Sequence, residues 1–536
     1  MGFGVKSAPL MASNRPQPRV TGNRYLISVA VMISALTAIL DTTIVNVSVP
    51  NIQAAFGADI DQITWVLTGY LISNVVIIPM TGWLANGVGL KRYYMASQIA
   101  FVVASMLCGA AWNLPSLVFF RILQGIGGGA LLPVSFSIML EAFPPEQTAQ
   151  ATAIFGSGTI LGPIIGPTLG GWLTENFSWR WIFYVNLPIV LVGLFMTYIA
   201  IQTPKREFTE KKAIDVLGLA SAAIWLTTFQ VVLQEGQRDD WFHSPLILWL
   251  AVISVVAGVV FIYTELTVEH PFINLRIFKD YNFSVGNGMG SVVAIALFGA
   301  VFLIPVFSAE VLGYNSLDIG LSLLPAALAS LPLFAVVARL VQRVDARILC
   351  GFGFLILTWS CWLNTYIDGN TSFWWLVFLN TTRSLALPFI FIPLTAIGIQ
   401  NLPQSQKPEA SALYNLTRTL AGSLAIAALG TFLVNRTAFH YARFSESVTQ
   451  FGSESMQRLS QLQAAFIARS GSDAQTAHLQ ALAAMKSELV RQSLIGGFDD
   501  AFRVLTVVSA GAVVLALSTR TPNIGAGSVH STAAIE

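Results

Sequence analysis

The sequence predicts an all-α membrane protein with fourteen transmembrane helices, arranged as two six-helix bundles plus two linker helices. The first supporting observation is composition: of 536 residues, 54% are hydrophobic and only 10% are charged, and the mean hydropathy is +0.67. Soluble domains carry about 25% charged residues, so that class is excluded. The second is length, because fourteen spans of roughly 20 apolar residues leave room for loops and tails. The third is the alternation of basic residues between successive loops.

Apolar runs bounded by charged and turn residues place the spans in chain order. The first six are expected at 25–50, 61–86, 93–112, 115–141, 151–172 and 181–202. A basic break follows, with Lys205, Arg206, Lys211 and Lys212. Two linker spans are expected next, at 213–234 and 244–265. The last six are expected at 283–310, 315–340, 347–367, 373–400, 412–434 and 502–519.

Lysine and arginine gather in alternate loops, which become cytoplasmic if the N-terminus lies inside the cell. We therefore expect a cytoplasmic tail at 1–24, the first bundle at 25–202, a linker with an interfacial segment at 203–282, the second bundle at 283–519, and a cytoplasmic tail at 520–536. The second bundle contains a predicted outer loop at 435–500, in which Met456–Ala468 and Ala474–Val490 have the pattern of polar amphipathic helices. That loop is either a solvated cap or a docking surface for a periplasmic partner.

Glycine and basic residues form three local motifs. The loop after the second span contains Gly82, Gly89, Lys91 and Arg92, and a degenerate copy at 338–347 follows the second span of the last six. This duplication predicts two related six-helix units. The fourth span contains Arg121 followed by Gly125, which places a cation beside a glycine-rich surface. The fifth span carries a glycine every four residues, with prolines between them, which predicts a close seam between helices: Gly158, Gly162, Pro163, Gly166, Pro167 and Gly170.

Together with Leu40–Pro50, these motifs resemble the major facilitator superfamily, and specifically its fourteen-span drug:proton antiporters. The segments Trp179–Pro188 and Asn415–Ser423 resemble the EmrB-type multidrug efflux pumps of that family. The resemblance implies the major facilitator fold, localisation in the bacterial inner membrane, and two partners, a periplasmic adaptor protein and an outer-membrane channel. The chain departs from the family at Asn86, where an acidic residue is usual, so a salt bridge gating the cytoplasmic side through that position is not assumed.

Charged side chains inside spans need a reason, since each costs roughly 2.5–3.5 kcal/mol at the bilayer centre. Asp41 is expected to carry the coupled proton, and the alternative is a permanently ionised structural partner of an arginine. The resemblance assigns the organisation of the proton pathway to Arg121, which is alternatively a packing cation. We expect the substrate cavity to include Asn46, Glu310, Arg383, Tyr414 and Arg418, although a structural role is the alternative for Arg418 and a solvent-facing one for Glu310.

The predicted function is secondary active export of lipophilic drugs or toxic compounds in exchange for protons. The sequence lacks the GxxxxGK[ST] loop of ATP-driven pumps. An enzyme is disfavoured because all five histidines lie outside the predicted spans and no HExxH or GxSxG motif occurs. The three cysteines lie in apolar runs, so no metal or cofactor is expected. A passive channel, or a single-component exporter of a siderophore, lipid or metabolite, is the alternative, and no nucleic-acid partner is expected at a net charge of +2.

Overall fold

The computed structural model describes residue 20 and residues 22–519, except 145–146, 160, 203–214, 269–270, 272, 400–401, 403–405, 449–452 and 472. The basic break at Lys205–Lys212, most of the first predicted tail and all of the second therefore lie outside the described residues. Helices make up all the secondary-structure elements of the described part. The all-α class predicted from the apolar runs is confirmed there.

The helices of the first part of the chain follow the predicted spans closely. Their bounds are α1 (Arg24–Phe56), α2 (Ile60–Ile63), α3 (Trp65–Val88), α4 (Leu90–Gly109), α5 (Leu114–Ala142), α6 (Thr148–Thr159), α7 (Gly162–Asn176), α8 (Trp181–Tyr184) and α9 (Asn186–Ala200). The predicted fifth span is thus divided into α6 and α7, and Pro163 stands in the first turn of α7. Proline is suited to that position because it has no N–H to donate.

The helices of the remaining chain include two that are much longer than a membrane is thick. Their bounds are α10 (Val216–Glu235), η2 (Trp241–His243), α11 (Pro245–Thr267), η3 (Leu275–Lys279), α12 (Tyr281–Glu310), α13 (Ser316–Leu340), α14 (Ala346–Leu363), η4 (Asn364–Tyr366), α15 (Phe373–Ile399), α16 (Lys407–Ser447), α17 (Ser453–Ser470) and α18 (Ala474–Ser518). The two long helices are α16, with 41 residues, and α18, with 45.

Twelve helices of the described part are long and apolar enough to cross a membrane. The predicted third and fifth spans do not reach that standard: α4 carries Lys91, Arg92 and Gln98, and α6 and α7 are 12 and 15 residues long. An all-helical architecture with many helices able to cross a membrane is therefore supported, whereas the total of fourteen crossings stays a prediction.

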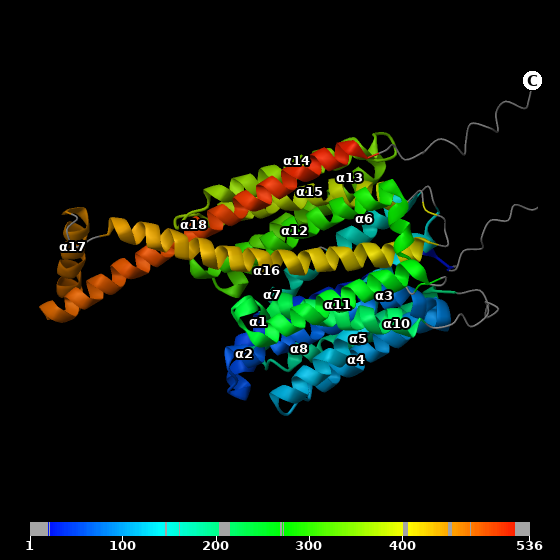
Figure 1. The fold of residues 1–536 in the computed structure, drawn as a ribbon, viewed down its shortest axis with the longest axis horizontal. Helices are drawn as coiled ribbons and strands as arrows, with labels where there is room; N and C mark the ends of the chain where they lie inside the picture. Colours follow the sequence, from blue (N-terminus) through cyan, green and yellow to red (C-terminus); the bar gives the residue numbers. More distant parts are fainter. Residues whose placement is uncertain are drawn as a thin grey trace, which may run out of the picture.

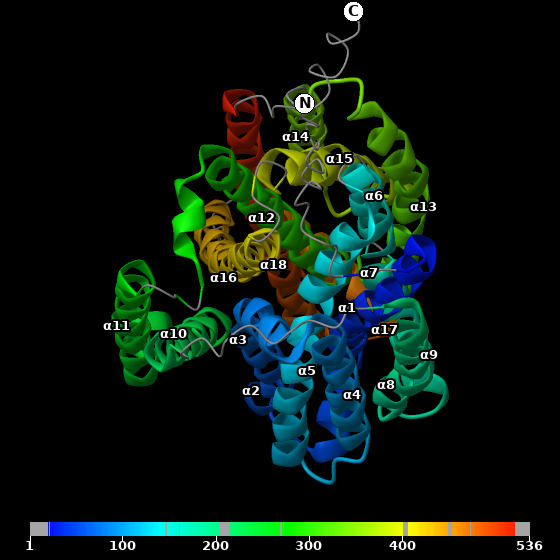
Figure 2. The same cartoon turned by 90° about the vertical axis from the view of Figure 1, so that its right-hand side faces the viewer.

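The helices gather in two groups on either side of a central seam, with α10 and α11 standing to one side (Figure 2). In one group α1 packs on α5, α7 and α9, and in the other α12 packs on α15, α16 and α18. The groups meet where α13 contacts α6 and α7, and where α16 contacts α3 and α5. The pair α10 and α11 attaches through the contacts of α10 with α3 and α16.

The region 435–500, predicted as an outer loop with amphipathic helices, is mostly helical. Helix α16 continues to Ser447, and α18 already begins at Ala474, so both extend well beyond the other helices, with α17 at their far end (Figure 1). The expected amphipathic helices in this region are confirmed as α17 and the first turns of α18. At the base of the extension Asp500 accepts hydrogen bonds from Arg436 Nε (2.6 Å) and His440 Nε2 (2.9 Å), which fasten α16 to α18.

Candidate functional site

A buried ion pair lies inside the first group of helices. Asp41 projects from α1 and Arg121 from α5, and Arg121 Nη1 lies 2.6 Å from Asp41 Oδ2. The side chains are 0% and 1% exposed, respectively. Breaking such a pair by removing one partner costs about 3–5 kcal/mol, because the other charge is left buried and uncompensated. The two residues that the sequence assigned to proton coupling are therefore in direct contact.

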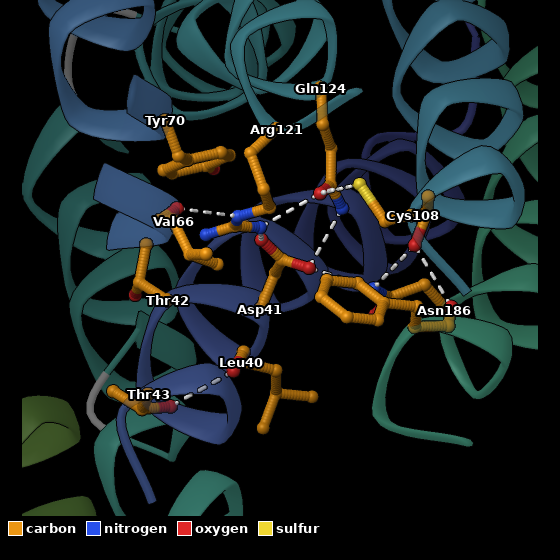
Figure 3. A network of polar contacts seen from close by, with 12 residues as sticks. Leu40, Asp41, Thr42, Thr43, Val66, Tyr70, Cys108, Arg121, Gln124 and Asn186 are labelled. Carbon is orange, nitrogen blue, oxygen red and sulfur yellow. Dashed lines mark hydrogen bonds and ion pairs between the residues drawn. The ribbon is translucent and has the colours of Figure 1, made fainter. Parts of the chain in front are cut away.

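Two amides complete the coordination of the Asp41 carboxylate. Its Oδ1 accepts from Gln124 Nε2 at 2.8 Å and from Asn186 Nδ2 at 2.9 Å, while Oδ2 accepts from Arg121. Gln124 Oε1 also accepts from Arg121 Nη1 at 2.7 Å. Figure 3 shows the cluster, in which side chains from α1, α5 and α9 converge on one carboxylate. Each donor is fully buried, so the network keeps an ionised Asp41 satisfied without water.

The guanidinium of Arg121 is held on its other side by α3. Its Nε donates to the carbonyl of Val66 at 3.1 Å, and its Cζ lies 4.3 Å from the ring centroid of Tyr70 (Figure 3). A backbone carbonyl can reach into the cluster because α3 and α5 approach closely. A Cβ at Gly125 would lie 2.5 Å from the carbonyl oxygen of Tyr70, so this contact requires glycine.

The glycine seam of the predicted fifth span faces α1, the helix that carries Asp41. Cβ atoms placed at these glycines would meet α1 side chains or backbone: Gly158 faces Met32, Gly162 faces Ile39, Gly166 faces Thr43, and Gly170 faces Ile44. Pro167 lies inside α7, between two of the glycines. The seam therefore fixes the position of α1 against α6 and α7, as a packing surface does.

Several residues of the cluster were not singled out by the sequence reasoning. Gln124 follows Arg121 by three positions on the same helix face, a spacing that signals contact. Asn186 lies within the family-like segment Trp179–Pro188, which was given no site role, whereas no local pattern marks Ser105 and Cys108. Asn186 also donates to Ser105 Oγ at 3.1 Å, and Cys108 Sγ lies 3.5 Å from Gln124 Oε1.

The predicted cavity residues of the second group of helices divide into two environments. Arg383 on α15 is 5% exposed, donates to Asn380 Oδ1 at 3.0 Å, and has no acidic partner among the described residues. Arg418 on α16 is half-buried, and its Cζ lies 5.1 Å from the ring centroid of Phe391. Tyr414, one helical turn before Arg418, lines a small cavity with residues of α12 and α15.

Asn46 and Glu310 are both exposed, Asn46 within α1 and Glu310 as the last residue of α12. Neither is drawn into the Asp41 cluster. The exposed position of Glu310 at a helix end favours the solvent-facing interpretation of that residue.

The loop motif joins α3 to α4. Gly89 lies between α3 and α4 and has φ +96°, a backbone conformation that favours glycine. Gly82 is not required by packing in the same way, because a Cβ there would meet nothing within 4 Å. Lys91 Nζ donates to the carbonyl of Tyr198 on α9 at 2.7 Å, and Arg92 is exposed.

In the degenerate copy of this motif, Asp345 caps α14 and pairs with Arg347 at 3.0 Å. The hydrogen bond from the Arg347 side chain lowers the pKa of Asp345 below its ordinary value. Asp345 therefore caps the N-terminus of its own helix, α14. Groups of histidine, cysteine and acidic residues able to hold a metal ion are absent from the described part of the chain.

Comparisons with known proteins agree on one family. The family model described as Major Facilitator Superfamily matches residues 31–426. The multidrug export protein EmrB of Escherichia coli (strain K12) is 35% identical over 443 residues, which cover 82% of this chain and 86% of that protein. The fatty acid resistance protein FarB of Neisseria gonorrhoeae is 31% identical over 89% of this chain and 92% of its own length.

Among solved structures, the crystal structure of the human organic anion transporter MFSD10 has a similar fold. Its TM-score is 0.55 at 13% sequence identity, and the match covers 91% of this chain and all of the other. At that identity the likeness concerns the fold alone.

Proposed function

This chain belongs to the major facilitator superfamily, as one of its EmrB-type multidrug efflux transporters, and on that premise we propose that it is a proton-coupled antiporter for lipophilic compounds. Multidrug efflux follows from the relatives, and a transporter rather than an enzyme is the class that the family implies. The proposal adds the driving ion, the residues that bind it and the alternation of access between the two groups of helices.

The observation that carries the proposal is the fully buried Asp41–Arg121 pair. A carboxylate inside an apolar helix is costly, and in membrane transporters such residues commonly carry protons. Asp41 is closed off from solvent in this conformation. Proton exchange therefore requires a second conformation, in which the contacts of Asp41 with Arg121, Gln124 or Asn186 open. Protonation of Asp41 would weaken its hydrogen bonds from Arg121, Gln124 and Asn186. The protonation state of Asp41 can therefore be linked to movement of α1 against α5 and α9.

The proton gradient supplies enough energy for concentrative export. One proton moving inward supplies about 2.3 kcal/mol per 100 mV of membrane potential. A pH difference adds about 1.4 kcal/mol per unit. Because about 1.4 kcal/mol corresponds to a tenfold concentration ratio, one proton supports a substrate gradient of about a hundredfold or somewhat more.

The experiment that tests this function uses the purified chain in proteoliposomes with an imposed pH gradient. We expect a fluorescent lipophile to move against its concentration gradient while protons move in the opposite direction. An uncoupler should abolish the accumulation. Movement that only equilibrates the lipophile, with or without the uncoupler, would instead identify a passive pathway.

The wider arrangement is part of the same proposal. We place fourteen spans in the inner membrane, with both termini in the cytoplasm, and divide the chain into two bundles at 25–202 and 283–519 with the linker at 203–282. The extension made by α16, α17 and α18 stands away from the bundles (Figure 1), which suits a surface for a periplasmic adaptor that leads to an outer-membrane channel. Export of a lipid is the second candidate, because FarB is named for fatty acid resistance.

A further inference from the structure

The linker helix α10 lies beside the seam between α3 of the first group of helices and α16 of the second (Figure 2). In the middle of α10, Leu226 is buried in a cluster with Val75 of α3 and Leu416 of α16. One turn further along the same face, Gln230 Nε2 donates to Ser423 Oγ of α16 at 3.1 Å. Because α10 contacts both groups, movement of α3 against α16 has to break some of these contacts.

The turn that follows α10 is attached to α3 by two side chains. Glu235 is 3% exposed and accepts from Thr68 Oγ1 at 3.0 Å, and Arg238 Nη1 donates to Thr64 Oγ1 at 2.7 Å. Glu235 and Arg238 also pair with each other at 2.7 Å. Thr64 directly precedes α3, and Thr68 lies in its first turn. These contacts therefore hold the end of α3 that faces outward in the proposed orientation.

The same turn reaches α16 through Trp241. The indole Nε1 donates to Thr431 Oγ1 of α16 at 3.2 Å and to Gln237 Oε1 of its own turn at 3.1 Å. Thr431 lies near the outer end of the span predicted at 412–434. The segment Glu235–Trp241, which we call the outer turn, thus bridges α3 and α16 at one end of the seam.

The backbone of the outer turn has a conformation that bulky residues rarely adopt. Asp240 has φ +56° and Trp241 has φ +50°, both in the left-handed region. The Trp241 N–H donates to the Gly236 carbonyl at 2.6 Å, and a Cβ at Gly236 would lie 2.7 Å from the indole ring. Backbone strain of this kind persists only where the surroundings fix the conformation, and it is common at switch segments. Here the strained turn places the Trp241 indole against α16.

We propose that the outer turn is a strap that keeps the outer end of the seam closed, and that the Trp241–Thr431 contact is the point at which it opens. The inference rests on the proposed alternation of access and assigns a function to the linker helices. When α16 moves away from α3, the Trp241 indole loses Thr431 but keeps Gln237 as an acceptor, so the release leaves the indole N–H paired. The linker then moves with α3, to which Glu235 stays attached.

The test measures the opening of the outer end directly and requires no substrate. Spin labels are attached at Gln62→Cys in α2 and Asn435→Cys in α16, because both positions are exposed and the three native cysteines are buried. Double electron–electron resonance in nanodiscs gives the distribution of distances between the labels. Trp241→Phe removes the donor of the contact, and Thr431→Val removes its acceptor with little change of shape. The matched control is Trp249→Phe, which changes an exposed tryptophan of α11.

We expect Trp241→Phe and Thr431→Val each to increase the population with the long label distance by about two- to tenfold, as for the loss of one hydrogen bond. The double variant should open no further than either single variant, because both changes remove the same contact. Trp249→Phe should leave the distribution unchanged. Unchanged distributions in both single variants, additive effects in the double variant, or an equal shift in Trp249→Phe would each overturn the strap.

Transport of the same variants is measured separately in proteoliposomes. Since the strap binds no coupled proton, Trp241→Phe and Thr431→Val should retain export that an uncoupler abolishes. Failure of proton-driven export in the unaltered chain would refute the proposed function without altering the label distances. An unchanged distance distribution beside normal export would refute the strap alone, so the two proposals fail separately.

Discussion

Replacement of Asp41 by asparagine separates a structural ion pair from a coupling device. The substitution preserves the size of the side chain but removes one acceptor oxygen and the charge. Arg121, which is 1% exposed, then has no counter-charge within its hydrogen-bonded cluster. Loss of one partner from a buried pair costs about 3–5 kcal/mol. We therefore expect Asp41→Asn to lower the melting temperature by several degrees, measured by thermal challenge and size-exclusion chromatography.

The double variant Asp41→Asn/Arg121→Gln distinguishes the two roles. It removes both charges, and exchange of a whole buried pair for neutral groups is often close to neutral in stability. We expect thermal stability to recover substantially while gradient-driven efflux in proteoliposomes stays absent, because no group remains to carry the proton. If efflux returned with stability, Asp41 would be a structural partner only, and the coupling argument would be refuted.

Glu235 provides the matched control for removing a buried carboxylate. It is 3% exposed at the end of α10, accepts from Thr68 Oγ1 at 3.0 Å and pairs with Arg238 at 2.7 Å. Because these contacts attach a linker helix to α3 and not to the Asp41 cluster, Glu235→Gln is expected to lower stability and to retain proton-driven efflux. Loss of efflux in this variant at normal folding would mean that coupling is not confined to Asp41.

Three further predictions concern the architecture. Gly166→Ala should destabilise the fold by about 1–3 kcal/mol, because the added Cβ overpacks against Thr43. The control Gly171→Ala should be tolerated, because its Cβ would meet only Val47, at 4.0 Å. Equal melting temperatures of the two variants would contradict a close-packed contact between the glycines of α7 and α1. Asp345→Asn should cost less than about 1 kcal/mol at neutral pH. The pKa of Asp345 is lowered in the folded state, so the stabilisation that its ionised carboxylate gives is present above the unfolded-state pKa and is lost as the pH falls through the folded-state pKa. The difference in melting temperature between Asp345→Asn and the unaltered chain should therefore shrink in acid. Asp500→Asn should speed amide hydrogen exchange in the outer part of α16 by about tenfold, since it weakens the contacts with Arg436 and His440, and unchanged exchange would show that other contacts hold the extension.

The sequence predicted the helices well because each apolar run is long and its boundaries carry charges. Asp41 and Arg121 also stood out, since charges are rare inside spans. The partners contributed by other helices did not stand out. Asn186 on α9 donates to the Asp41 carboxylate and also to Ser105 on α4, and such convergence depends on packing between distant segments. The sequence also could not distinguish the surroundings of Arg383 from those of Arg418, because the rotation of a helix about its axis is set by its neighbours.

The continuity of α16 and α18 through the outer region was not predicted, for another reason. The residues there are too polar to signal a span, and the sequence predicted only two amphipathic helices within an outer loop. In the structure the two helices support each other through Asp500, Arg436 and His440, so helix continues where no membrane signal exists. The pattern of apolar residues predicted separate amphipathic helices, but it could not predict that they continue the spans, because that continuity depends on a partner distant in the sequence.

The most direct test of the central claim is substrate-evoked proton release. The purified, detergent-solubilised chain is mixed in weakly buffered solution with a substrate identified in the transport assay, and a pH indicator records the protons released. The unaltered chain should release protons on binding substrate, and the Asp41→Asn/Arg121→Gln variant, folded to the same extent, should release none. Equal release from both proteins, or none from the unaltered chain at saturating substrate, would contradict proton coupling through Asp41.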